Sequence, residues 1–285
     1  MKTLTIIGGS GFLGKSIIDY AQKKGLSKWQ INKIICISRR KIYLKNRNSF
    51  KVKYITGDIS KLKKLYPADY IMYAVNSDSS KKNLSAIKNF SLLLEKLPKK
   101  TKILFTSSGA VYGSIKSKKK YAKNKLILEN IFKSYGKKGY QVSIARLFTF
   151  IGNRILNDKK YAISDFINSA FYKKKIVLKS KNKVYRSYMH SDDMTRWLIT
   201  ILVSSNTKCP IYNVGSDESI SLQNLAKIIG KIFKKPVEIK KTNNKKIERY
   251  VPSIKKVQKE LNLKINYKLR PSLYSIIKWR CKQKN

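Results

Sequence analysis

The chain has 285 residues, and its 64 lysines and arginines against 15 aspartates and glutamates give a formal net charge of +49. Three cysteines far apart in the sequence and a single histidine provide neither a disulfide framework nor the spacing of a metal site, so we expect reduced thiols and no structural metal. No apolar run approaches the roughly 20 residues that a membrane-spanning helix needs. Because Met1 leads directly into an apolar strand pattern, without room for a signal peptide, we expect a cytoplasmic protein.

The positive charge attracts nucleic acid, anionic membranes and phosphorylated small molecules alike, so by itself it identifies no partner. The lysines are spread through every segment of the chain, whereas recognition surfaces concentrate charge on one face. We therefore interpret the charge as a bias of composition and expect no nucleic-acid partner, although that alternative stays open.

The amino-terminal segment has the pattern of a strand, a glycine turn and a helix. An apolar run over residues 4–7 is followed by Gly8-Gly9-Ser10-Gly11-Phe12-Leu13-Gly14 and then by apolar residues at helical spacing. Glycines at 8, 11 and 14 permit a sharp turn, a close approach of the backbone to a pyrophosphate, and tight packing of the helix on the sheet. The helix N-terminus then faces the phosphates. The pattern predicts a dinucleotide-binding turn, and the alternative is a glycine turn that only connects two elements.

Strand and helix patterns continue to alternate along the first 150 residues. Further strands are predicted at 33–38, 52–55, 69–75, 102–105 and 142–148, with an amphipathic helix over 84–97 that ends at Pro98. The alternation predicts an α/β fold with a Rossmann-like, doubly wound parallel sheet and ligands at the carboxyl ends of its strands.

Beyond residue 150 the alternation weakens, and we expect a smaller, interleaved C-terminal substrate-binding lobe. Helices are predicted at 165–172, 193–203, 221–233 and 253–261, and strands at 176–178 and 211–215. We expect Ser221, Ser253 and one of Asp192 and Asp193 to cap the helices that follow them. Residues 1–150 with about 184–215 would form the dinucleotide-binding domain, and about 151–183 with 216–285 the lobe.

The end of the second predicted strand bears on the choice of dinucleotide. In this kind of fold an acidic residue about 20 residues past the glycines binds the ribose hydroxyls, whereas an arginine accommodates a 2′-phosphate. The chain has Arg39 and Arg40 at this position. We therefore favour NADP over NAD, with the alternative that two basic residues carry no meaning in so lysine-rich a chain.

Tyr121 and Lys125 are four residues apart, so on a helix they share one face. An ammonium so placed favours the phenolate and lowers a tyrosine pKa that is ordinarily about 10. Such a tyrosine can exchange a proton with a substrate hydroxyl or carbonyl. The pair alone is weak evidence in this composition, but a strand pattern ending in Ser107-Ser108 precedes it and a dinucleotide turn begins the chain.

The chain resembles the extended short-chain dehydrogenase/reductases, of the family called NAD-dependent epimerase/dehydratase, whose members mostly act on nucleotide sugars. The resemblance rests on the order and spacing of stretches at 8–14, 57–58, 107–113, 121–125, 146–152, 185–193, 212–215 and 249–253. It implies that Tyr121 is the acid or base at a sugar oxygen, that Ser108 hydrogen-bonds this oxygen, and that Lys125 holds the nicotinamide ribose while tuning Tyr121.

The resemblance also implies the ligand contacts. Cofactor contacts would come from Gly8, Gly11, Phe12, Leu13, Gly14, Arg39, Arg40, Asp58, Ile59, Ala74, Val75, Tyr121, Lys125 and Phe148. A nucleotide-diphosphate sugar would contact Ser108, Thr149, Arg186 and Arg249. Arg186 would bind the diphosphate, with Arg249 a weaker candidate for the same contact. A homodimer is left open.

Departures from the family pattern narrow the expected reaction. Gly109-Ala110 stand where family dehydratases have an Asp-Glu pair, so we do not expect sugar 4,6-dehydration. The loop between Gly113 and Tyr121 is shorter than in many members, and Thr149 stands where the family often has asparagine. We expect hydride transfer at sugar C4 by an NADP-dependent 4-keto-sugar reductase in polysaccharide biosynthesis. A nucleotide-sugar 4-epimerase is the alternative, and a non-catalytic basic RNA-binding or scaffold protein is the alternative of another class.

Overall fold

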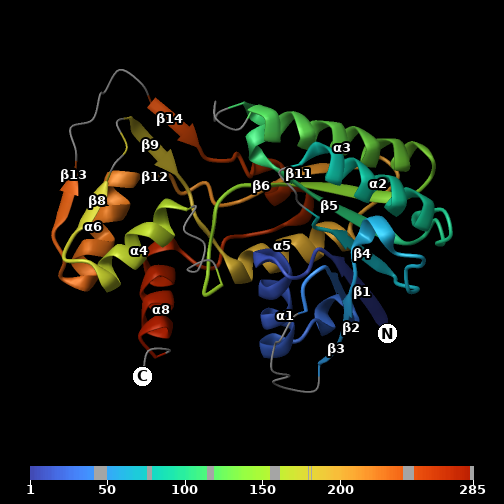
Figure 1. The fold of residues 1–285 in the computed structure, drawn as a ribbon, viewed down its shortest axis with the longest axis horizontal. Coiled ribbons are helices and arrows are strands. Elements are labelled where there is room, and N and C mark those ends of the chain that lie inside the picture. Colours follow the sequence, from blue (N-terminus) through green and yellow to red (C-terminus); the bar gives the residue numbers. More distant parts are fainter. Residues whose placement is uncertain are drawn as a thin grey trace.

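The computed structural model describes residues 1–41, 50–75, 79–113, 119–154, 161–178, 180, 182–239 and 247–282. These residues form two parts (Figure 1). The larger part is built on a seven-stranded sheet, and the smaller part, on the left of the figure, combines helices with short strands.

The central sheet is parallel throughout. It contains β1 (Lys2–Ile7), β2 (Ile31–Ser38), β3 (Lys51–Thr56), β4 (Tyr70–Tyr73), β5 (Lys102–Ser108), β6 (Gln141–Leu147) and β11 (Ile211–Val214), in the order β11-β6-β5-β4-β1-β2-β3. The winding reverses between β1 and β4, where a doubly wound sheet opens a crevice at the carboxyl ends of its strands. The predicted α/β, Rossmann-like sheet is confirmed, although β4 is shorter and β5 longer than expected.

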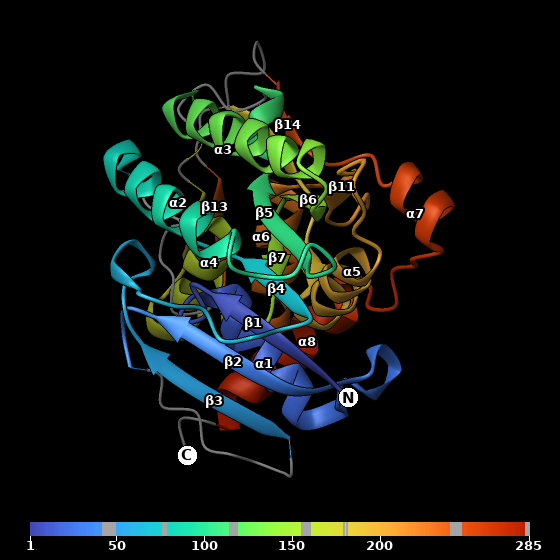
Figure 2. The same ribbon diagram turned by 90° about the vertical axis from the view of Figure 1, so that its right-hand side faces the viewer.

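Helices cover both faces of this sheet, as Figure 2 shows. α1 (Phe12–Lys24) and α5 (Ser191–Val203) pack on one face, and α2 (Ser80–Leu94) and α3 (Lys119–Lys137) on the other. Successive side chains of a strand point to opposite faces, so Ile6 joins the first core with Trp197, and Ile7 joins the second with Phe132. Burial on both faces explains why inner strands such as β4 and β5 have continuous apolar runs, whereas the edge strand β3 does not.

The smaller part has its own apolar core between α4 (Ala162–Tyr172), α6 (Leu222–Phe233) and α8 (Leu269–Lys282). Strands β8 (Ile176–Leu178) and β13 (Val237–Ile239) pair with each other, as do β7 (Phe150–Ile151) and β10 (Met189–His190). A three-stranded sheet has the order β12 (Ile220–Ser221), β9 (Lys183–Arg186), β14 (Ile247–Tyr250). This smaller part is the lobe that the weaker alternation after residue 150 predicts, and it is called the lobe below.

The domain division stays a prediction, and two segments pack differently from it. β9 pairs with β12 and β14, within the lobe. By contrast, α7 (Lys255–Leu261) belongs with the central sheet, since Ile254 and Val257 are buried in the core that contains α5.

The helix caps follow the sequence only in part. The Ser221 hydroxyl accepts the Asn224 N–H at 3.1 Å and caps α6 as predicted. The predicted cap at Ser253 is wrong, because α7 begins after Ile254 and has no side-chain cap. Neither Asp192 nor Asp193 caps α5; the Nδ1 atom of His190 accepts the Asp192 N–H at 3.1 Å.

Candidate active site

A cleft of about 890 Å³ opens at the carboxyl ends of β1, β5 and β6, between the central sheet and the lobe. From the sheet side it is lined by Gly8, Gly11, Phe12, Leu13, Ala74, Thr106, Ser107, Ser108, Tyr121, Lys125, Leu147, Phe148, Thr149 and Phe150, and from the lobe side by Tyr161, Ala162, Ser180, Val184, Arg186, Tyr188, Leu222, Glu248 and Tyr250. The topology of the sheet places a ligand site at this edge.

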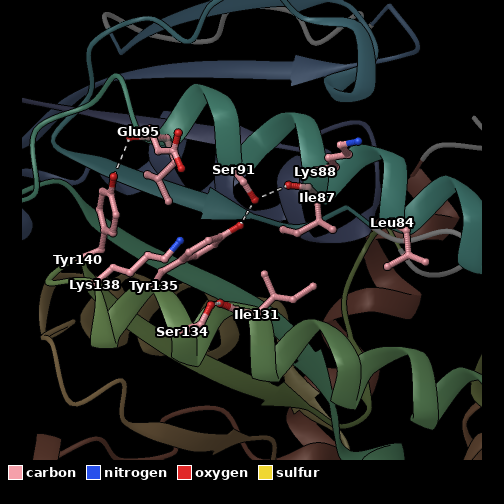
Figure 3. Close-up of a pocket in the computed structure, with 11 residues that line it drawn as sticks. Leu84, Ile87, Lys88, Ser91, Glu95, Ile131, Ser134, Tyr135, Lys138 and Tyr140 are labelled. Carbon is pink, nitrogen blue, oxygen red and sulfur yellow. Dashed lines mark hydrogen bonds between the residues drawn. The ribbon is translucent and has the colours of Figure 1, made fainter.

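A second hollow, of about 420 Å³, lies between α2 and α3 (Figure 3). Its lining includes Ile87, Ser91 and Tyr135, and the Ser91 hydroxyl bonds both to the Tyr135 hydroxyl and to the Ile87 carbonyl. None of the predicted site residues lines it. The cleft over the sheet is therefore the candidate active site.

The glycine turn forms one wall of the cleft. Gly8 has a φ of +93°, and a Cβ there would lie 2.6 Å from the Ala74 carbonyl oxygen. A Cβ on Gly14 would lie 2.3 Å from the backbone of Gly9, so glycine is needed for α1 to start this close to the turn. Gly11 is exposed, and its Cβ would have no closer neighbour than the Gly8 carbonyl at 3.8 Å. α1 begins at Phe12, and its N-cap residue Gly11 provides no side-chain cap. A helix N-terminus can bind phosphate through its backbone N–H groups.

Lys125 is buried where α3 crosses β5, with 4% of its surface exposed. Its Nζ donates to the Thr106 carbonyl at 3.0 Å and lies 5.8 Å from the centre of the Tyr121 ring. Burial lowers the pKa of Lys125 to about 8, and the charge of Glu129 opposes that change. Both Tyr121 and Lys125 line the cleft, as their helical spacing predicts.

Ser108 ends β5 beside this pair. Its Oγ accepts the Ala110 N–H at 3.2 Å, which fixes the start of the 3₁₀ turn Gly109–Tyr112. On the lobe side of Ser108 lies Tyr250, whose hydroxyl donates to the Leu147 carbonyl at 3.2 Å. Burial raises the pKa of Tyr250 to about 12, and Ser108 opposes the rise.

Arg186 brings a positive charge to the lobe side of the cleft. Its guanidinium pairs with Glu248 and lies 5.7 Å from the centre of the Tyr250 ring. Arg249 is exposed, does not line the cleft, and lies over the ring of Tyr185 at 5.9 Å. Because alternate residues of a strand point to opposite faces, Glu248 and Tyr250 of β14 reach the cleft while Arg249 does not.

The other predicted site residues lie outside the cleft lining. These are Gly14, Arg39, Arg40, Asp58, Ile59, Val75 and Arg249. Arg39 and Asp58 lie near each other at the ends of β2 and β3: hydrogen bonds from Ser60 and the charge of Arg39 lower the pKa of Asp58. Phe148 and Thr149, which follow β6, do line the cleft.

Sequence reasoning missed Glu248 and Tyr250, although it singled out Arg249 between them. Predicting a strand over 247–250 would have revealed them, because alternate residues of a strand point to opposite faces. Glu248 and Tyr250 would then share one face, and Arg249 would lie on the other. The described residues hold no group of three or more His, Cys, Asp or Glu side chains suited to a metal ion. Within the same residues, no helix has both the length and the apolar character needed to cross a bilayer.

The sheet order, the turn at Gly8 and the Tyr121–Lys125 face define a dinucleotide-dependent enzyme of the extended short-chain dehydrogenase/reductase type. Comparison with known proteins is more specific. Residues 4–215 match the NAD dependent epimerase/dehydratase family, and the chain belongs to that family.

Relatives and solved structures agree with this assignment. UDP-glucuronic acid decarboxylase 6 of Arabidopsis thaliana is 24% identical, over 95% of this chain and 86% of the relative. The solved UDP-N-acetylglucosamine 4-epimerase of Methanobrevibacter ruminantium M1 has a TM-score of 0.77 at 20% identity and covers 99% of both chains. The dTDP-glucose 4,6-dehydratase of Bacillus anthracis str. Ames, solved in complex with NAD, has a TM-score of 0.79 at 17% identity and covers 99% of this chain and 97% of its own. At these identities the structural likeness establishes the fold.

Proposed function

We propose that the protein transfers a hydride between a nicotinamide dinucleotide and C4 of a nucleotide-diphosphate sugar, and acts as a 4-keto-sugar reductase. One observation carries the proposal: Ser108, Tyr121 and Lys125 meet at one wall of the cleft, with Arg186 on the other. The family assignment and the names of the three relatives, all of which act on nucleotide sugars, support the substrate class.

The residues on the sheet side fit a dinucleotide. Gly11 leaves room where a side chain would fill the cleft, and the uncapped start of α1 offers N–H groups to a pyrophosphate. Lys125, deeper in the cleft, would bind the nicotinamide ribose. When bound, the dinucleotide supplies the hydride donor or acceptor.

The side chains of this protein would move and hold the proton. Tyr121 gives a proton to the sugar oxygen in reduction or takes it in oxidation, and Ser108 hydrogen-bonds that oxygen as charge develops on it. The ammonium of Lys125 stabilises the phenolate of Tyr121. Because the pKa of Lys125 is about 8, this ammonium is mostly present at neutral pH and is lost as the pH rises through that value.

Two residues favour NADP as the dinucleotide. Arg39 and Arg40 are exposed at the end of β2, the position that contacts the adenosine ribose in this fold. Asp58, close to Arg39, would contact the adenine from the end of β3. NAD is the alternative, supported by the dehydratase neighbour solved with NAD.

Arg186 is the residue we assign to the substrate diphosphate, because its planar guanidinium matches phosphate oxygens and it lines the cleft. Arg249 is a poor second candidate, since it is exposed and lies outside the cleft lining. The neutral residues Gly109 and Ala110 next to Ser108 cannot transfer protons, which argues against dehydration.

A 4-epimerase is the second candidate, favoured by the likeness to a solved 4-epimerase. The two activities differ in net consumption of reduced dinucleotide. Purified protein would be mixed with NADPH, or with NADH, and nucleotide 4-keto sugars, and absorbance at the nicotinamide band followed. A reductase consumes one reduced dinucleotide for each sugar reduced, whereas an epimerase consumes none. Absence of both consumption and sugar interconversion with every nucleotide sugar would refute the proposal.

A further inference from the structure

Glu129 of α3 is a carboxylate with none of its surface exposed. It accepts a hydrogen bond from the Ser107 hydroxyl at 2.6 Å and two from the Arg146 guanidinium, at 3.0 and 2.8 Å. Burying a carboxylate is unfavourable unless it is paired and hydrogen-bonded, and here it is both. The proposed chemistry assigns this charge no task.

Neighbouring residues of β5 hold Glu129 and Lys125. The Thr106 carbonyl accepts the hydrogen bond of Lys125, and the next residue, Ser107, donates to Glu129. Glu129 follows Lys125 by four residues, so both lie on the face of α3 that packs on the sheet. Lys125 lines the cleft and Glu129 does not, which places the carboxylate behind the ammonium.

The other charges near Lys125 make Glu129 distinctive. α3 packs against β5, β6 and the 3₁₀ turn, whose titratable side chains are Lys102, Arg146 and Tyr112. The titratable side chains of α3 itself are Lys119, Lys120, Tyr121, Lys123, Glu129, Lys133, Tyr135 and Lys137, besides Lys125. Among these described groups Glu129 is the acidic residue. Glu129 is also the charged group that opposes the effect of burial on the pKa of Lys125.

We propose that Glu129 is a positioning residue whose carboxylate, held by Ser107 and Arg146, keeps the Lys125 ammonium charged beside Tyr121. The inference deepens the proposed function and rests on it for the task of Lys125. Its physical basis is electrostatic: a buried ammonium tends to lose its proton, and a nearby negative charge opposes that loss.

The test measures the titration of Lys125 without any substrate. The full chain is labelled with acetic anhydride over a range of pH, and modification of Lys125 is quantified by peptide mass spectrometry. Glu129→Gln preserves side-chain size and removes the charge, so the pKa of Lys125 falls below that of the native protein, by about one unit or tenfold in its ionisation constant. Glu129→Asp keeps the charge on a shorter side chain, so the pKa of Lys125 should stay closer to that of the native protein than it does in Glu129→Gln.

An electrostatic role predicts the larger change in Glu129→Gln, which loses the charge, whereas a packing role predicts the larger change in Glu129→Asp, which alters the side-chain size. Asp193→Asn is the matched control, because Asp193 is an equally buried carboxylate paired with Arg196 on a different helix. It should leave the titration of Lys125 unchanged. If Glu129→Gln does not fold, the titration of Lys125 in the native protein still decides the matter, since a Lys125 side chain that is mostly uncharged at neutral pH overturns the proposal.

The kinetic counterpart separates this inference from the proposed function. In Glu129→Gln the alkaline limb of the kcat/KM profile should move to lower pH, together with the Lys125 titration. If the native protein turns over substrate but the pKa of Lys125 is unchanged in Glu129→Gln, the proposed role of Glu129 is refuted and the proposed function stands. Absence of turnover with every nucleotide sugar would refute the proposed function, while the labelling result would still report on the coupling of Glu129 and Lys125.

Discussion

Two regions of the molecule each contain a carboxylate with no exposed surface, and they use it differently. Glu129, under the cleft, is bonded by Arg146 and Ser107 of two central strands. Asp193, in α5, pairs with Arg196 and accepts the backbone N–H groups of residues 266 and 267 at 2.9 Å each. The charge of the first carboxylate acts on Lys125, a cation of the candidate site. The second carboxylate binds the chain just before α8. Both carboxylates are fully buried, so the groups that each one binds, and not its burial, indicate its role.

The largest expected effect is on stability, from Asp193→Ala. It leaves Arg196 without its carboxylate and two backbone N–H groups without an acceptor, so unfolding in urea should become easier by about 3–5 kcal/mol. Turnover per folded molecule should be unchanged. If turnover falls by more than the fraction of folded protein does, Asp193 also affects the candidate site, and its role is not limited to stability.

Next in size is the loss of turnover in Tyr121→Phe. The substitution removes the hydroxyl that we assign to proton transfer and should lower kcat by about 10²-fold or more. Dinucleotide binding, measured by calorimetry, and the melting temperature should stay close to those of the native protein. Native turnover in this variant would show that another group moves the proton.

The glycine turn offers a pair of substitutions that separates stability from binding. Gly14→Ala forces a Cβ to within 2.3 Å of the Gly9 backbone and should destabilise the protein by about 1–3 kcal/mol. Gly11→Ala meets nothing closer than 3.8 Å and should leave stability unchanged while weakening dinucleotide binding. Calorimetry and thermal melting measure both effects. If Gly11→Ala binds the dinucleotide as tightly as the native protein does, the dinucleotide does not bind against this turn.

The smallest effect is expected at a helix cap in the lobe. Ser221→Ala removes the side chain that accepts the Asn224 N–H and should cost about 1 kcal/mol of stability. Ser253→Ala is the control, because Ser253 caps no helix, and it should melt with the native protein. Equal losses of stability in both variants would contradict the assignment of a stabilising cap to Ser221 alone.

The sheet and the glycine turn could be predicted because their signals are local. Gly8 needs a positive φ and Gly14 needs close packing, and both demands act between residues near each other in the sequence or across one strand. The predicted pairing of Tyr121 with Lys125 followed from helical spacing in the same way. The prediction of a helix cap was wrong where neighbouring side chains can both cap one helix end, as His190 and Asp192 can at the start of α5.

The lobe side of the site could not be predicted by the same means. β14 is short, and its pairing with β9 determines that Tyr250 reaches the cleft and Arg249 does not. Glu129 is unremarkable as one acidic residue of an amphipathic helix. It becomes a buried charge only because Ser107 and Arg146, 22 and 17 residues away in the chain, lie against it.

By itself, then, the sequence of this protein determined the parallel sheet, the glycine turn and the face of α3 that carries Tyr121 and Lys125, since each arises from spacing within a short segment. Only the tertiary structure decided which arginine faces the cleft, which tyrosine closes it from the lobe, and which carboxylate lies behind Lys125. Those outcomes depend on burial and on the direction of side chains from distant segments, and no local pattern encodes where two such segments meet.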